Sequence, residues 1–408
     1  MNSLSLQSRF RSLPRELALF IIASFAIGMA GSLVDSSLNN FLNDTFALNG
    51  FQRSFLEFPR EFPGVITLFV SAALWFLGSR RLGGAAMIFA AVGIFLIGFS
   101  STNYLTMVVF LFIYSLGNHL FMPVSTTVGM ELASDGRTGH RLGQLNAIRN
   151  AATIVGSFIV FIGFKYLNFN YQTSFTIAAV VFLAAAVLMF MMQPKRSAAP
   201  RTFLKLRKEY SLYYALSVLS GARKQIFITF APWVIVTIFN KPTQTLATLY
   251  TIGGIIGILF QPLLGKTIDK FGERFVLTTE AVALVFVCVG YGFSRSVFSE
   301  NTAFLITCVC YLLDQMLFSV GMARSTYMKK IALDPADIQP ALSAAVSVDH
   351  VFSISIALLG GVIWNQFGFQ YVFLLGVLIA ASNFFVARLI RLPATFQVTS
   401  TPDMQGNR

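Results

Sequence analysis

Charged side chains with a regular spacing lie in a segment that is otherwise apolar. Arg53, Glu57 and Glu61 follow one another at four-residue intervals, and Arg60 lies beside them. On a helix, residues four apart share one face. Carboxylates close to arginines in a low-dielectric setting exchange a proton after small changes of environment. We therefore interpret Glu57 and Glu61, together with Asp35, as candidates for proton coupling. The alternative is that Glu57 and Glu61 form static ion pairs with Arg53 and Arg60 that fix helix packing.

A second set of polar side chains interrupts four other apolar stretches. An arginine in such a place suits a carboxylate or a phosphate, which favours an anionic or zwitterionic ligand. A histidine there either titrates near neutral pH or serves as a hydrogen-bonded core group. The alternative for the cations is a structural pair with an acid of the same set or with another acid. The predicted substrate-binding residues are Asn39, Asn118, His119, Arg223, Lys224, Asp314 and Gln315.

Long apolar runs must position these residues. The 408-residue chain is 55% hydrophobic and 12% charged, whereas a soluble domain carries about 25% charged residues. A membrane-spanning helix needs about 20 apolar residues, and a backbone in lipid must satisfy its own hydrogen bonds. We predict an all-α integral membrane protein with twelve spans, at 17–42, 52–77, 82–99, 104–130, 142–166, 173–192, 210–239, 246–264, 275–293, 303–328, 338–364 and 370–389.

Lysines and arginines between the spans are unevenly distributed. Nearly all of those outside the spans fall on the side of the N-terminus, and the exceptions are Arg53, Lys165, Lys241 and Arg295. Cytoplasmic loops carry the excess of basic residues, so we predict a multi-pass plasma-membrane protein with both termini in the cytoplasm. The same bias accounts for the net charge of +13 without a nucleic-acid partner.

A charged stretch divides the spans into six and six. It predicts an N-terminal six-helix bundle at 1–193, a cytoplasmic linker at 194–209 and a C-terminal six-helix bundle at 210–392, followed by a flexible cytoplasmic tail at 393–408. The fourth and tenth spans share tyrosine, leucine and phenylalanine at matching positions, with Asn118 opposite Gln315. Gene duplication explains such an echo, although chance matches among apolar residues remain the alternative.

One loop motif suggests a family. Residues 265–274 read GKTIDKFGER, which resembles the G-x-x-x-D-[RK]-x-G-x-[RK] cytoplasmic loop of the major facilitator superfamily. The resemblance implies a latch between the two bundles in the outward-open state, with Asp269 and Arg274 as gating residues. Asp269 is also suited to cap a helix N-terminus. The first-half counterpart, at 78–84, has no aspartate, which argues against a first-half latch of the usual kind.

The resemblance also implies a mechanism. Members of the family are secondary transporters that work by alternating access, and their first, fourth, seventh and tenth spans line the central cavity. Each of these spans carries polar residues of the two sets above. Because no nucleotide-binding motif is present, proton coupling is the expected driving force. Arg149 and Asp349, in the fifth and eleventh spans, either pair across the bundle interface or take local partners, and we favour a structural role.

Several alternatives are weaker. The fifth span lacks the Gly-Pro-x-x-Gly-Gly motif of the family's drug/proton antiporters, so drug efflux ranks below solute transport. A non-transporting membrane sensor on a transporter fold is the other alternative. No P-loop, metal-ligand pair or nucleophile elbow is present, so we predict neither an enzyme, nor a metal, nor a cofactor. The expected partners are a small-molecule solute, protons and the lipid bilayer, and the expected state is a monomer.

Overall fold

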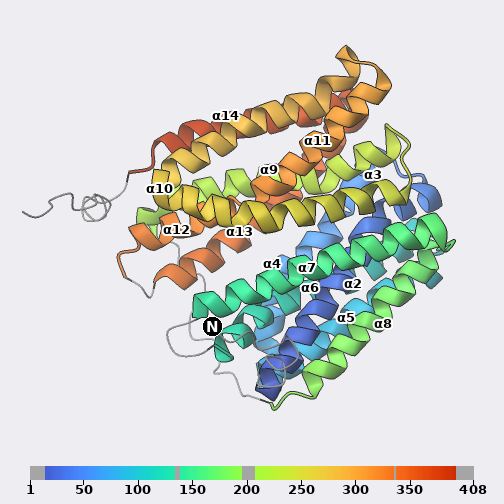
Figure 1. Cartoon of the computed structure of the whole chain (residues 1–408), viewed down its shortest axis with the longest axis vertical. Coiled ribbons are helices and arrows are strands. Elements are labelled where there is room, and N and C mark those ends of the chain that lie inside the picture. The colour runs from blue at the N-terminus through green and yellow to red at the C-terminus, as the bar shows by residue number, and fades with distance from the viewer. Residues whose placement is uncertain (1–13, 134–137, 195–206, 335–336, 392–408) are drawn as a thin grey trace, which may run out of the picture. The chain divides into compact units, whose positions relative to one another are not determined.

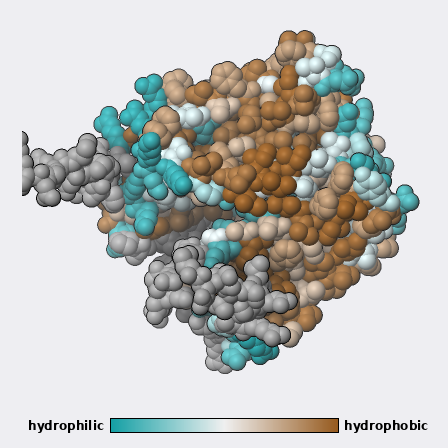
Figure 2. Space-filling view, viewed as in Figure 1, coloured by the Kyte–Doolittle hydropathy of each residue, from teal (hydrophilic) through white to brown (hydrophobic). Residues whose placement is uncertain are grey.

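The molecule consists of long helices (Figure 1). The computed structural model describes residues 14–133, 138–194, 207–334 and 337–391, and these contain no β-strand. Nine helices in these ranges are long and apolar enough to cross a membrane. On the face in Figure 2, hydrophobic side chains gather over the middles of the helices and hydrophilic ones near their ends. The predicted all-α membrane fold is confirmed, while the predicted tail and most of the predicted linker lie outside the described residues.

The first six predicted spans correspond to helices. Three asparagines, Asn49, Asn103 and Asn170, begin α3, α6 and α8 as N-caps, each accepting a backbone N–H with its side chain. Helix α5 packs against α6 and α8, and α2 packs against α7 and α8. The elements are α2 (Arg15–Phe46), α3 (Gly50–Phe55), α4 (Glu57–Ala73), η1 (Trp75–Leu77), α5 (Gly78–Ser100), α6 (Tyr104–Glu131), α7 (Thr138–Tyr166) and α8 (Tyr171–Phe190).

The second half follows with two departures from the predicted spans. The eighth and ninth spans form one long element broken at Gly272, whose φ of 80° suits glycine. The tenth span divides between α11 and α12. The elements are η2 (Lys208–Tyr210), α9 (Ser211–Thr237), α10 (Thr243–Val297), α11 (Glu300–Phe318), α12 (Gly321–Ile331), α13 (Ile338–Phe367) and α14 (Phe369–Arg388).

Backbone conformations repeat between the two halves. Described residues with positive φ occur after the first span, before the third span and between the fifth and sixth spans of each half. Positive φ is uncommon outside tight turns, so its return at equivalent places supports the pseudo-symmetry expected from duplication. The pairs are Ala47 with Asn240, Gly78 with Gly272, and Asn168 with Gly368.

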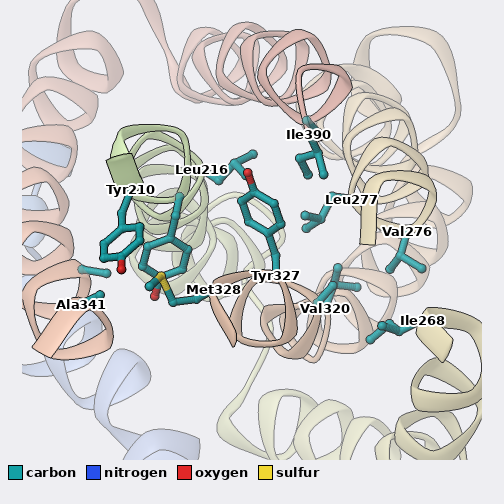
Figure 3. Packing of buried hydrophobic residues seen from close by; sticks show 14 of the residues in the cluster. Tyr210, Leu216, Ile268, Val276, Leu277, Val320, Tyr327, Met328, Ala341 and Ile390 are labelled. Carbon is teal, nitrogen blue, oxygen red and sulfur yellow. The ribbon is translucent and has the colours of Figure 1, made fainter. Parts of the chain in front are cut away.

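The described residues form two compact units. Unit 1 comprises Met1–Pro200 and Thr229–Ile258, and unit 2 comprises Arg201–Ile228 and Leu259–Arg408. Unit 1 therefore includes the second part of α9 and the first part of α10. The core of unit 2 is built around Tyr210 and Tyr327, whose rings lie among aliphatic side chains such as Leu216 (Figure 3). The predicted boundaries at 193 and 210 stay a prediction.

Candidate functional site

The charged residues of the second span form a buried cluster in unit 1. Arg53 Nη1 lies 2.7 Å from Glu57 Oε1, and Arg53 Nε donates to Asn39 Oδ1 at 3.2 Å. Arg60 Nη1 lies 3.3 Å from the same Glu57 oxygen. Arg53 is 2% exposed and Glu57 is fully buried. The four-residue spacing therefore places Arg53 over Glu57 although the helix is interrupted at Leu56, and the ion pairs weighed from the sequence are present.

Asp35 differs from its neighbours on α2. It is the only exposed residue of that helix between Ala23 and Leu42. It forms no hydrogen bond or ion pair with the part of the chain that the structure describes, although Arg60 lies near enough for the two charges to interact. A carboxylate that forms no ion pair but lies near an arginine can gain or lose a proton without breaking an ion pair.

The carboxylates of unit 1 outnumber the nearby arginines. Asp35, Glu57 and Glu61 carry three negative charges when ionised, against two positive charges on Arg53 and Arg60. Glu61 is 9% exposed, and the charge of Arg60 acts on it as well. These carboxylates therefore outnumber the arginines by one, so one of them can take up a proton without leaving an arginine unbalanced.

The polar residues of α6 are held mainly by their own helix. His119 Nδ1 lies 3.0 Å from both the hydroxyl and the carbonyl oxygen of Ser115. Asn118 Nδ2 donates to the Tyr114 carbonyl at 3.3 Å. The Ser115 hydroxyl also donates to the carbonyl of Arg60 on α4. His119 thus connects through Ser115 to the backbone of Arg60. Whether His119 titrates or serves as a hydrogen-bonded core group stays a prediction.

Unit 2 holds a second ionic cluster, around Arg223. Arg223 Nη1 lies 2.5 Å from Asp314 Oδ1, and Nη2 lies 3.2 Å from Glu280 Oε1. Arg324 Nη1 reaches the other Glu280 oxygen at 3.5 Å. Arg223 and Asp314 are each 3% exposed and Glu280 is 2% exposed. The Phe318 ring centroid lies 5.2 Å from the Arg223 guanidinium carbon. The cluster joins α9, α10, α11 and α12.

Glu280 was missed in the sequence. It is the only charged residue of the apolar run 275–293, and a lone charge in a predicted span is a usable signal because such charges are almost always paired or functional. The resemblance to the family implied that the first, fourth, seventh and tenth spans line the cavity, and Glu280 lies in the ninth span. The structure places Glu280 between Arg223 and Arg324.

Lys224 and Arg149 each have a partner within their own unit. Lys224 Nζ lies 2.6 Å from Asp349 Oδ2, with side-chain exposures of 28% and 16%. Arg149 Nη2 donates to Asn146 Oδ1 at 2.6 Å on its own helix. Whether Arg149 and Asp349 pair across the bundle interface or keep local partners stays a prediction. Gln315 Nε2 is buried and has no hydrogen-bond partner among the described residues.

At Gly272, where α10 is broken, the ion pair is formed by Glu273 and not by the predicted latch residues Asp269 and Arg274. Asp269 and Arg274 are both exposed, whereas Glu273 between them is fully buried and lies 2.7 Å from Lys330. Asp269 does not cap a helix, because α10 continues through it to Gly272. The gating role of Asp269 and Arg274 stays a prediction.

The loop at 78–84 in the first half has no aspartate, but its Arg80 pairs with acids from two other helices. Arg80 Nη1 lies 3.0 Å from Glu131 Oε2, and Arg80 Nε lies 3.5 Å from Glu16 Oε2. Both Glu16 carboxylate oxygens also accept from the backbone N–H of Gln193 at 3.2 Å. These contacts link the ends of α2, α5 and α6 to Gln193, three residues beyond the end of α8.

Long apolar helices with two buried ionic clusters are typical of multi-pass membrane transport proteins. Charged residues within a membrane usually mark the path of a substrate or an ion. The chain belongs to the Major Facilitator Superfamily, whose family model matches residues 20–348. This confirms the family suggested by the loop motif and establishes a transporter class.

Solved structures share the fold. The nucleoside transporter NupG (D323A mutant) superimposes with a TM-score of 0.71 at 15% identity, covering 91% of this chain and 98% of NupG. A D-xylose–proton symporter gives 0.68 at 14% identity, covering 90% of this chain and 96% of the symporter. The inward-open xylose transporter XylE from E. coli gives 0.66 at 16% identity, covering 93% and 96%. Comparison with curated proteins finds no significant match.

Proposed function

We propose that the chain is a proton-coupled secondary transporter of a small solute, working by alternating access as a plasma-membrane monomer with cytoplasmic termini. The single observation that carries the coupling is the unpaired, exposed Asp35 beside Arg60, in a cluster with one carboxylate more than it has arginines. The D-xylose–proton symporter with the same fold is, by its name, proton-coupled, so the fold is compatible with this mechanism.

Asp35 acts as the proton carrier in this proposal. When Asp35 is ionised, Arg60 is attracted by both Asp35 and Glu57. When Asp35 binds a proton, only the carboxylates of α4 remain to balance Arg60. The Arg60 side chain is 29% exposed and its contact to Glu57 is 3.3 Å long, so Arg60 has room to change its balance between the two acids. Glu57 and Glu61 complete the set of proton-coupling groups.

The charge balance of unit 2 indicates which cation would contact an anionic or zwitterionic solute. Arg223 is compensated by two carboxylates and is 3% exposed, so an anionic group would have to displace one of them. Lys224 has one carboxylate partner and its side chain is 28% exposed. We therefore assign the contact with the solute's anionic group to Lys224, with Arg223, Asp314 and Gln315 shaping that site and Asn39, Asn118 and His119 supplying polar groups in unit 1.

Proton movement in liposomes tests this function. Purified protein is reconstituted with a pH-sensitive dye inside, and amino acids, carboxylates, sugars and nucleosides are added one at a time. We expect at least one anionic or zwitterionic solute to change the internal pH with the wild type and not with Asp35→Asn. The matched control is Glu300→Gln, which removes an exposed acid in the first turn of α11 and should leave the response unchanged.

The outcomes separate the alternatives. Equal proton movement in Asp35→Asn and wild type would remove Asp35 from the coupling mechanism. A solute that raises thermal stability, as a bound ligand must, but never crosses the bilayer would favour the sensor. Exchange of protons for bulky apolar cations would favour the drug/proton antiporter.

A further inference from the structure

Unit 1 contains a set of contacts that join first-half helices to the turn between α9 and α10. We name it the α9–α10 clasp. It comprises hydrogen bonds to two backbone carbonyls and two hydroxyl pairs: Asn40 Nδ2 to Lys241 O at 2.9 Å, Gln244 Nε2 to Phe164 O at 3.1 Å, Ser157 Oγ with Thr251 Oγ1 at 2.8 Å, and Tyr171 Oη with Thr243 Oγ1 at 3.5 Å. These bonds tie the segment from Lys241 to Thr251 to α2, α7 and α8, and all of these residues belong to unit 1.

Arg53 connects the charge cluster of unit 1 to this clasp. Its guanidinium carbon lies 5.8 Å from the ring centroid of Trp233, on the part of α9 that leads into the clasp. Its Nε donates to Asn39, and the next residue of α2, Asn40, makes the clasp bond to Lys241. Arg53 is thus held between α2, α4 and α9, with 2% of its surface exposed.

The position of Arg53 depends on a carboxylate oxygen that it shares. Glu57 Oε1 accepts from Arg53 at 2.7 Å and from Arg60 at 3.3 Å. Arg60 in turn responds to the charge of Asp35. When Asp35 is neutral, Arg60 is drawn more strongly to Glu57 and competes with Arg53 for that oxygen. A buried arginine that loses its counter-charge is strongly destabilised where it stands.

Other charged or titratable groups also surround Arg53 and Arg60. Glu61 lies on the same helix and acts on Arg60. Tyr250 of α10 and Tyr104 of α6 face Arg53. Tyr114 of α6 faces both Arg60 and Asp35. Tyrosines are neutral until about pH 10. His119 of α6 bonds to Ser115, whose hydroxyl donates to the Arg60 carbonyl, and it lies within 4.8 Å of Glu61. The carboxylates and His119 are therefore the groups near Arg53 and Arg60 that can change charge around neutral pH.

We propose that Arg53 is the positioning residue that couples proton binding to the α9–α10 clasp, through the relay Asp35–Arg60–Glu57–Arg53. A proton on Asp35, or directly on Glu57, weakens the hold of Glu57 on Arg53. Arg53 then leaves Asn39 and Trp233, and the clasp loosens. The only chemical change is the protonation of a carboxylate oxygen. This proposal rests on the proposed function, in which Asp35 carries the proton.

The clasp can be followed by disulfide formation between Ser157→Cys and Thr251→Cys, in a background where Cys288, Cys308 and Cys310 are serine. The parent hydroxyls are 2.8 Å apart, so a mild membrane-permeant oxidant should cross-link the closed clasp rapidly. All variants are compared at one pH, because thiol reactivity itself depends on pH. Glu300→Gln serves as the control for removal of an acid in unit 2.

The expected results are graded. Glu57→Gln should slow cross-linking about tenfold, because it removes the counter-charge of a buried arginine. Asp35→Asn should slow it about two- to fivefold, because it acts through Arg60. Glu300→Gln should change nothing. Cross-linking at the parent rate in both Glu57→Gln and Asp35→Asn would overturn the proposal.

A double replacement keeps the test decisive if Glu57→Gln folds poorly. Arg53→Met with Glu57→Met replaces the buried pair by apolar side chains of similar length, which proteins often tolerate. In that background, adding Asp35→Asn should no longer change the cross-linking rate. A remaining twofold or larger effect of Asp35→Asn would show that the signal bypasses Arg53, against the proposal.

The cross-linking experiment needs no solute, so it is independent of the transport assay. If the protein moves solute together with protons but its cross-linking rate does not depend on Glu57 or Asp35, the relay is wrong and the proposed function stands. If the cross-linking rate changes as expected but the protein moves no solute, the relay stands and the proposed transport function is wrong.

Discussion

The two ionic clusters differ in charge balance. In unit 1, three carboxylates accompany two arginines, and Asp35 is exposed without an ion pair among the described residues. In unit 2, the cluster around Arg223 has two carboxylates, Glu280 and Asp314, for two arginines, Arg223 and Arg324. The separate pair of Lys224 and Asp349 is balanced as well. An unbalanced cluster can take up a proton at little cost, whereas a balanced buried cluster resists any change of charge.

This difference suggests a division of labour. The unit 2 cluster joins four helices through Arg223 and Glu280, so it fixes the positions of those helices. The unit 1 cluster shares one Glu57 oxygen between two arginines, so it can redistribute its contacts. We expect substitutions in unit 2 to change stability most, and the removal of Asp35 to change proton response with little change in stability.

The largest loss of stability should follow from Arg223→Ala. It leaves Asp314 and Glu280 buried with Arg324 alone, and removing one partner of a buried pair costs about 3–5 kcal/mol. Thermal unfolding of the detergent-solubilised protein measures the effect. Adding Asp314→Asn should restore part of the loss, since it removes the unpaired charge. Unchanged stability of the single variant would contradict the structural role of this cluster.

A medium effect should follow from Gly221→Ala. A Cβ at this position would overlap the Asp349 carboxylate, so Asp349 must move away from Lys224. Overpacking of this kind costs about 1–3 kcal/mol. The matched control is Gly257→Ala on α10, where a Cβ meets nothing within 4 Å. Equal unfolding temperatures for the two variants would show that the Lys224–Asp349 pair adjusts freely.

The fold was largely predictable from the sequence. Apolar runs of span length predicted the helices because lipid leaves the backbone no alternative. The breaks in the helices were harder to predict. The four-residue spacing of Arg53 and Glu57 continues across the interruption at Leu56, so the sequence pattern does not show that break. The positive φ of Gly272 likewise leaves no mark in the apolar pattern of α10.

The charges of the candidate sites were predictable, but their partners were not. Spacing placed Arg53 beside Glu57 because residues four apart share a helix face, and Leu56, between α3 and α4, keeps a right-handed helical backbone. The partners of Arg223 come from α10 and α11, far away in sequence, so only the tertiary structure could reveal that Glu280 and Asp314 share it. Asp35 was visible in the sequence as an acid within an apolar run, but its lack of an ion pair among the described residues depends on how α2 packs.

A small effect should follow from Phe318→Leu. The Phe318 ring lies 5.2 Å from Arg223, and a cation–π contact contributes about 0.5–1 kcal/mol at exposed sites and about 2 kcal/mol when desolvated. Since Arg223 keeps both carboxylates, we expect the lower end of that range in thermal unfolding. A loss as large as that of Arg223→Ala would mean that packing around Phe318, rather than charge balance, holds the unit 2 cluster together.

The smallest change of stability should follow from Asp35→Asn, which makes the sharpest test of the comparison. Asp35 is exposed and forms no ion pair within the described chain, so its replacement should alter stability by about 0.5 kcal/mol or less, as for surface positions. The same variant should lose the solute-dependent proton movement. If Asp35→Asn instead destabilised the protein as much as Arg223→Ala, Asp35 would be a structural charge like those of unit 2. The excess carboxylate of unit 1 would then not be a proton carrier, because a group whose charge the fold requires cannot be neutralised in each transport cycle.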